Sequence, residues 1–144
     1  MVSILVSGHG NISLGLLDAF EMIFGGDPNV QAAPFLKGEG LPQVTEKFTK
    51  VYEQLAEGDE LLILVDVFGG TPYNAAAQLA FGKSNVDIVT GVSLPMLLEG
   101  AAIKDTLPLA DLVGHLKQAS QESIKVFTEE VKQIQESEDE EDLL

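Results

Sequence analysis

The chain contains no cysteine among its 144 residues. This absence excludes a disulfide framework, thiolate catalysis and cysteine-based zinc sites, and it fits a reducing cytoplasm. The amino terminus carries no basic stretch, and no apolar run approaches the roughly 18 residues that a membrane span requires. We therefore expect a soluble cytoplasmic protein, and the length suits a single domain that buries roughly 70% of its unfolded surface.

Positive charge is scarce, because 8 basic residues face 23 acidic ones and give a formal net charge of −15. Six of the acidic residues lie within residues 136–142, and removing their six charges from −15 leaves −9 for residues 1–135. Such a surface repels nucleic acid and anionic lipid, and it favours either a basic protein partner or simply solubility. We interpret residues 1–135 as the folded domain and residues 136–144 as a disordered acidic tail.

Histidine is also rare, with two in the whole chain. His9 stands in "SGHG", residues 7–10, directly after the apolar run of residues 2–6 and before a stretch with helical periodicity. Its flanking glycines remove side-chain bulk and permit unusual backbone angles, so its imidazole should be exposed beside backbone amides. His115 falls on an expected helix in a setting typical of an ordinary surface residue. His9 is therefore the candidate functional histidine.

Apolar runs alternate with helical periodicity, a pattern typical of an α/β domain with a mainly parallel sheet. The expected strands are residues 2–6, 29–36, 60–66 and 86–90. Pro34 deletes a ladder donor and places the second strand at an edge, whereas the third is apolar throughout, as a central strand must be. Right-handed crossovers then favour an open sheet of order 2-1-3-4 with helices on both faces.

The expected helices lie between these strands and after the last one. Asn11 or Ser13 is placed to cap the first, and the second runs from about Gln43 toward Gly58. Toward the carboxyl end, residues 109–116 have helical spacing, whereas periodicity leaves residues 123–131 open between a continued helix and a short extra strand.

The carboxyl ends of the first and third strands carry the candidate site. In a 2-1-3-4 sheet these strands are neighbours whose onward connections diverge, and open α/β sheets bind ligands at that switch point. His9 follows the first strand and Asp66 ends the third. A carboxylate that binds one imidazole nitrogen fixes the tautomer, leaves the other nitrogen nucleophilic and stabilises the positive ring formed on attack.

A helix should begin in the same crevice, within "LVDVFGGTPYNAA" of residues 64–76. Its two glycines make the turn, Thr71 is a good N-cap and Pro72 suits the first helical position. Amides at this helix end, with the Thr71 hydroxyl, would hold phosphoryl oxygens, and we assign phosphate binding to Gly10, Gly70 and Thr71. The combination predicts a phosphoryl-accepting histidine. The alternative is a plain capped helix start beside a histidine and an aspartate that never meet.

Other chemistries fit the sequence less well. In "GHGNIS" Ser13 stands where a dinucleotide-binding fingerprint needs its third glycine, and no G-x-x-x-x-G-K-[ST] loop occurs. The two histidines do not form an H-x-x-x-H motif, and no carboxylates stand at a comparable spacing, so the sequence does not support a metal site. The residues call for no metal and no cofactor.

With these residues in hand, the chain closely resembles the IIA components (EIIA) of the mannose-family phosphoenolpyruvate-dependent sugar phosphotransferase system of bacteria. The resemblance runs from about residue 2 to 116 and rests on "SGHG", "LVDVFGGTPYNAA" and "GVSLPMLLE" (residues 91–99), which match the family's three signature regions in order and spacing. It implies that the carrier HPr phosphorylates His9, which passes the phosphoryl group to a histidine of EIIB. Sugar entering through the membrane components EIIC and EIID is then phosphorylated. Asp66 and Thr71 match the family's histidine-bonded aspartate and turn hydroxyl.

Two further points follow from the resemblance. Ser93 replaces an asparagine that is common in the third region, which puts an amide-specific contact there in doubt but not the relay. No EIIB-like domain follows, so we expect the acceptor to be a separate chain. Family members form homodimers that exchange an antiparallel carboxyl-terminal strand, which favours the strand interpretation of residues 123–131. A phosphorylation-responsive regulatory module and a noncatalytic flavodoxin-like nucleotide-binding domain remain the alternatives.

Overall fold

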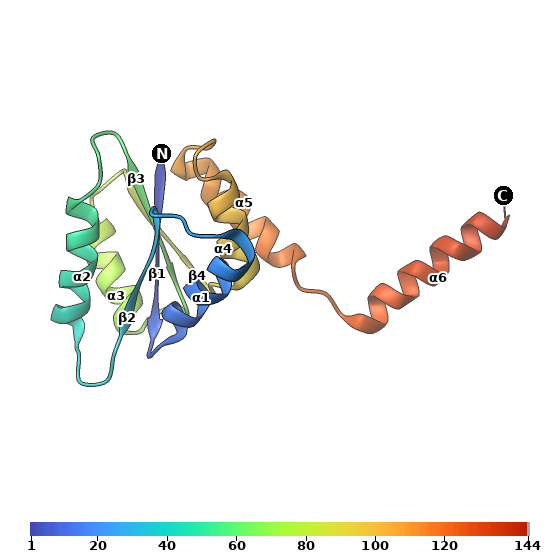
Figure 1. Ribbon diagram of the computed structural model, residues 1–144, viewed down its shortest axis with the longest axis horizontal. Helices are drawn as coiled ribbons and strands as arrows, with labels where there is room; N and C mark the ends of the chain where they lie inside the picture. The colour runs from blue at the N-terminus through green and yellow to red at the C-terminus, as the bar shows by residue number, and fades with distance from the viewer. Residues whose placement is uncertain (144) are drawn as a thin grey trace.

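The computed structural model describes residues 1–143 and forms an α/β fold around one sheet (Figure 1). The four strands are β1 (Val2–His9), β2 (Val30–Phe35), β3 (Glu60–Val65) and β4 (Val86–Thr90). All neighbouring strands are parallel and the order is β2-β1-β3-β4, which confirms the order expected from the sequence.

Helices cover both faces of the sheet (Figure 1). One face packs against α1 (Ile12–Phe24), α4 (Leu94–Ile103) and α5 (Leu109–Glu122), and the other against α2 (Leu41–Glu53) and α3 (Gly70–Ala80). Within residues 1–143, no helix has both the length and the apolar composition that crossing a bilayer requires.

The two central strands are buried on both faces, and their side chains alternate between two cores. Ile4 of β1 and Leu62 of β3 face α1, α4 and α5, whereas Leu5 and Ile63 face α2 and α3. All four side chains are at most 1% exposed. Burying such a side chain fully contributes about 1.5–3 kcal/mol. The two cores therefore fix the register of the sheet and the positions of the strand ends.

The ends of β1 and β2 differ from the sequence expectation in a way that concerns the site. β1 continues three residues beyond the expected 2–6 and ends at His9 itself. The Gly10 amide then donates a hydrogen bond of 2.8 Å to the carbonyl of Phe35, the last residue of β2. Within residues 1–143, β2 pairs only with β1, so the prediction that Pro34 places this strand at an edge is confirmed.

In the single chain, residues 123–131 form no strand, and the strand exchanged within a dimer stays a prediction. α5 ends at Glu122, and α6 (Phe127–Leu143) begins after a short irregular segment. An edge strand needs a partner for its backbone groups, whereas a helix satisfies them internally. The acidic residues in the first turn of α6, Glu129 and Glu130, also complement the positive end of the helix.

The acidic tail also differs from expectation, because residues 136–143 continue α6 where the sequence predicted disorder. Glutamate is a good helix former, so this composition supports a helix as well as an unstructured chain. Figure 1 shows α6 extending away from the sheet and its covering helices. Leu144, the last residue of the predicted tail, lies outside the described residues.

Candidate functional site

The site is built where β1 and β3 end side by side. Ser7 pairs with Val65 across the two parallel strands, so His9 and Asp66 emerge at the same edge of the sheet. His9 Nδ1 lies 2.8 Å from Asp66 Oδ2, and the same oxygen accepts the backbone amide of His9 at 2.9 Å. The structure thus brings together the two side chains that the sequence placed at neighbouring strand ends.

The carboxylate of Asp66 is held by three N–H groups. Besides the two from His9, the Val67 amide donates to Oδ1 at 2.9 Å. Partial burial raises the pKa of Asp66, but the hydrogen bonds from the amide and ring of His9 and from Val67 together outweigh it. The pKa of this carboxyl therefore lies below its ordinary value, and Asp66 is ionised at neutral pH. An ionised acceptor places the proton of a neutral His9 ring on Nδ1.

The other nitrogen of the ring, Nε2, is directed toward the start of α3. The His9 side chain is 51% exposed, and within residues 1–143 Nε2 makes no hydrogen bond. Gly70 has a φ of +83°, and a Cβ added to it would stand 3.5 Å from Nε2 and 3.3 Å from Cε1. The absence of a side chain at Gly70 therefore lets the helix start lie against the Nε2 side of the imidazole.

The start of α3 differs by two residues from the predicted one. α3 begins at Gly70 with Gly69 as N-cap and no side-chain capping bond, so Thr71 and Pro72 are the second and third helical residues. Positive φ at both glycines turns the chain directly into the helix. Proline is tolerated in the first turn because amides there have no intrahelical partner. The Gly70 and Thr71 amides are therefore available at the positive end of α3.

The amide of Gly10, which the sequence predicts to bind phosphate, already has a backbone partner. It donates a hydrogen bond of 2.8 Å to the Phe35 carbonyl, whereas within residues 1–143 the amides at the start of α3 have no such partner. The candidate phosphate-binding groups are therefore those of Gly70 and Thr71.

Phe35 is a site residue that the sequence analysis missed. Its ring packs edge-on against the imidazole of His9, with ring centroids 5.5 Å apart and an interplanar angle of 68°. The two residues are register partners across β1 and β2. The available signal was an aromatic residue at the end of the strand expected beside the first one, but its orientation depends on the side-chain alternation of both strands.

The loop after β4 adjoins the site through its backbone. The Gly91 amide donates to the Asp66 carbonyl at 3.2 Å, and the Val92 amide donates to the Val65 carbonyl at 3.1 Å. Ser93 then caps α4, because its Oγ accepts the Met96 amide at 3.3 Å. Serine and asparagine both serve as N-caps, so the departure at position 93 preserves this function.

The second histidine lies apart from this arrangement. His115 is exposed on α5 and lines a separate hollow with Asp111 and Gln118. No group of three or more histidine or acidic side chains suited to a metal ion occurs in the part of the chain that the structure describes.

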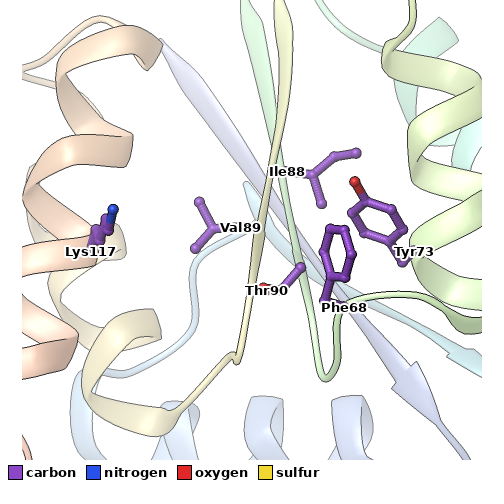
Figure 2. Close-up of a pocket in the computed structure, with 6 residues that line it drawn as sticks. All are labelled: Phe68, Tyr73, Ile88, Val89, Thr90 and Lys117. Atoms are coloured by element: carbon purple, nitrogen blue, oxygen red, sulfur yellow. The ribbon is translucent and has the colours of Figure 1, made fainter.

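A hollow of about 360 Å³ lies beside the site at the outer edge of β4. Figure 2 shows it on both sides of this strand, with Lys117 of α5 on one side and Phe68 and Tyr73 on the other. Its lining residues are Phe68, Tyr73, Ile88, Val89, Thr90 and Lys117. Within residues 1–143, β4 pairs only with β3, so this edge is free of a further strand.

Comparison with known proteins agrees with this geometry. The family model EIIA-man, described as "PTS system fructose IIA component", matches residues 3–117. The chain belongs to this family. The fructose-specific EIIA component of Bacillus subtilis is 42% identical over 134 residues, covering 93% of this chain and 92% of that protein. The sorbose-specific EIIA component of Lacticaseibacillus casei is 37% identical over 121 residues, covering 84% of this chain and 87% of that protein.

Solved EIIA structures share the fold. The crystal structure of an EIIA component from Streptococcus agalactiae matches with a TM-score of 0.82 and 27% identity, covering 89% of this chain and 98% of that one. EIIA proteins are components of the phosphotransferase system (PTS), so the resemblance first noted in three short stretches extends over most of the chain.

Proposed function

We propose that this EIIA chain is a cytoplasmic phosphoryl carrier, accepting a phosphoryl group from phospho-HPr on His9 and passing it to a histidine of a separate EIIB chain. One observation carries the proposal: Asp66 holds His9 Nδ1 at 2.8 Å, while Nε2 is left free beside the start of α3. Sugar uptake through the membrane components EIIC and EIID would then be served indirectly.

The transfer balances with the groups present. The lone pair of His9 Nε2 attacks the phosphorus, a new N–P bond forms, and the N–P bond of the donor histidine breaks with its electron pair remaining on the donor nitrogen. The Nδ1 proton stays in the hydrogen bond to Asp66, so the phosphorylated ring is positively charged and the carboxylate compensates that charge. In the second transfer, His9 is the leaving group and returns to its neutral state.

The start of α3 supplies the groups that stabilise the phosphoryl group during its transfer. The Gly70 and Thr71 amides and the positive end of the helix dipole are suited to the oxygens of a transferring phosphoryl group. The Thr71 side chain is half-buried and is not used as a cap, so its hydroxyl is available as a further donor. These amide and hydroxyl donors would together hold a phosphoryl anion without a metal ion.

The net charge of the chain indicates what kind of partner it binds. With a formal net charge of −15, the chain attracts a basic carrier and repels nucleic acid. We assign HPr as donor and EIIB as acceptor on this basis and on family membership.

We also propose that the chain forms a homodimer through the free edge of β4. The segment between α5 and α6 exposes Ile124 at 77%, Val126 at 46% and Phe127 at 80%. A second copy that adds residues 123–131 as an antiparallel strand would cover the hollow of Figure 2 and bury these side chains. In that dimer the strand interpretation of the segment would hold.

Onward transfer tests the carrier function. The phosphorylated chain is purified, mixed with its cognate EIIB, and both proteins are weighed by intact mass spectrometry over time. A carrier loses its phosphoryl group as EIIB gains one, and His115→Ala behaves like the wild type. Retention of the phosphoryl group in the presence of EIIB would instead assign His9 to a regulatory module.

A further inference from the structure

We propose that Phe35 is a positioning residue for His9, and that its ring keeps the imidazole turned so that Nε2 faces the start of α3. The inference rests on the proposed function, in which Nε2 receives the phosphoryl group.

The need for a second contact follows from the exposure of the imidazole. Half of the His9 side chain is open to solvent, and Asp66 holds it at Nδ1 alone. Rotation of a histidine ring about χ2 is governed by a broad, shallow potential, so one hydrogen bond leaves the far edge of the ring free to swing. Because Nε2 lies on that far edge, its direction depends on what packs against the ring.

Phe35 provides this packing. The two rings are 5.5 Å apart at 68°, within the edge-to-face range that aromatic pairs prefer. Phe35 is partly buried and packs against the core beneath α2 and α3. The Gly10 amide binds its carbonyl, which ties it to the residue that follows His9. A contact anchored in the core thus limits the movement of an exposed ring.

An ion pair between Lys47 of α2 and Glu39 of the loop before it holds the neighbours of Phe35 in turn. The Pro34 carbonyl accepts Lys47 Nζ at 2.8 Å, and the Leu36 amide donates to Glu39 Oε1 at 2.8 Å. Lys47 Nζ and Glu39 Oε1 are 2.7 Å apart, so the residues on both sides of Phe35 are tied to the same pair. The Lys47 ammonium, followed by the Leu36 amide, holds the pKa of Glu39 below its usual range, so this carboxylate is ionised at neutral pH.

This arrangement compensates for the position of β2. An edge strand has a neighbour on one side alone, so its end is freer to move than that of a central strand. Lys47 and Glu39 supply the missing restraint on both sides of Phe35, whose ring contacts His9. If Phe35 served only to pack the core, its contact with the imidazole would not matter. Substitutions of Phe35 can therefore separate a packing role from an orienting role.

The test compares two substitutions of Phe35. Phe35→Tyr keeps the aromatic plane, whereas Phe35→Leu fills much of the same space without it. Phe81→Leu is the matched control, because this residue is 89% exposed at the far end of α3. ¹⁵N-labelled histidine reports the tautomer of His9 by NMR. Phosphorylation rates are measured with HPr and with phosphoramidate, a small donor that needs no docking surface.

We expect Phe35→Leu to increase the share of the Nε2-protonated tautomer of His9 and to slow phosphorylation by both donors, about threefold to tenfold. Phe35→Tyr and Phe81→Leu should match the wild type. Glu39→Gln leaves the core unchanged and should shift the tautomer in the same direction by a smaller amount. It therefore tests the inference even if Phe35→Leu fails to fold.

Two results would overturn the inference. An unchanged tautomer and an unchanged phosphoramidate rate in folded Phe35→Leu would show that the ring of Phe35 does not orient His9. Slower transfer from HPr alone would make Phe35 a docking residue instead. If the wild type accepts no phosphoryl group from either donor, the proposed function fails, while the tautomer measurement still decides whether Phe35 orients the imidazole.

Discussion

At the scale of single residues, Asp66 combines two functions in one carboxylate. Its oxygens accept the His9 amide and ring and the Val67 amide, so it both fixes the chain at the end of β3 and holds the imidazole. An asparagine is nearly the same size and still accepts an amide. It neither stabilises a positive ring nor selects the tautomer that leaves Nε2 free.

Asp66→Asn should therefore fold normally and transfer poorly. A general base or orienting group is typically worth about 10² to 10⁴ in rate, so we expect at least a tenfold loss in the rate of transfer from HPr. Rapid-quench measurement gives this rate, and circular dichroism confirms folding. An unchanged rate in the folded variant would mean that Asp66 merely ends the strand.

Gly70 is the second residue that decides access to Nε2. A Cβ at position 70 would stand 3.3 Å from Cε1 and 3.5 Å from Nε2 of His9, at a φ of +83°. Gly70→Ala should lose roughly 1 kcal/mol of stability to backbone strain and should also slow phosphorylation by about tenfold or more through crowding of the reacting nitrogen.

Gly69→Ala is the matched control for this prediction. Its φ is +86°, but an added Cβ would meet no atom within 4 Å. We expect a similar stability loss in urea unfolding and a much smaller change in rate. Equal rates for the two variants would contradict the crowding of Nε2 by position 70.

The predictability of the site depended on which interaction set each position. Strand ends follow from apolar runs, so the sequence placed His9 and Asp66 at one edge of the sheet. The Gly10 amide and the Phe35 ring depend on hydrogen bonding and side-chain direction between β1 and β2, which composition does not encode. The start of α3 was misplaced because two positive-φ glycines removed the need for a Thr71 cap.

At the scale of secondary structure elements, the buried strands were predictable from the sequence and the carboxyl-terminal segment was not. The strands of the sheet were predictable because burial on both faces demands continuous apolar runs. Residues 123–131 contain both strand-favouring and helix-favouring residues, so we expect their structure to depend on whether a partner strand is present. Local sequence alone therefore left this element open.

Ending the chain after Gln135 should preserve the fold and phosphorylation of His9. The deleted part of α6 has no buried residue among positions 136–142, and Figure 1 shows it standing away from the sheet. The expected result is a cooperative thermal unfolding transition at an unchanged midpoint and labelling equal to that of the full chain. Loss of cooperative unfolding would show that the acidic residues contribute to the packed domain.

At the scale of the whole molecule, the unpaired edge of β4 and the exposed apolar segment after α5 are complementary surfaces. We expect the full chain to be a dimer by light scattering coupled to gel filtration, because strand addition covers both surfaces. Truncation after Glu122 removes the segment and should yield a monomer, while truncation after Gln135 retains the dimer. A monomeric full chain, or a dimer that survives truncation after Glu122, would contradict this interface.

The central claim concerns a single nitrogen atom in the whole protein. Incubation with phosphoenolpyruvate, enzyme I and HPr, followed by intact mass measurement and peptide mapping, tests it most directly. The account predicts one phosphoryl group on His9, lost in acid, absent from His9→Ala and unchanged in His115→Ala. An acid-stable phosphoserine, or undiminished labelling of His9→Ala, would contradict it.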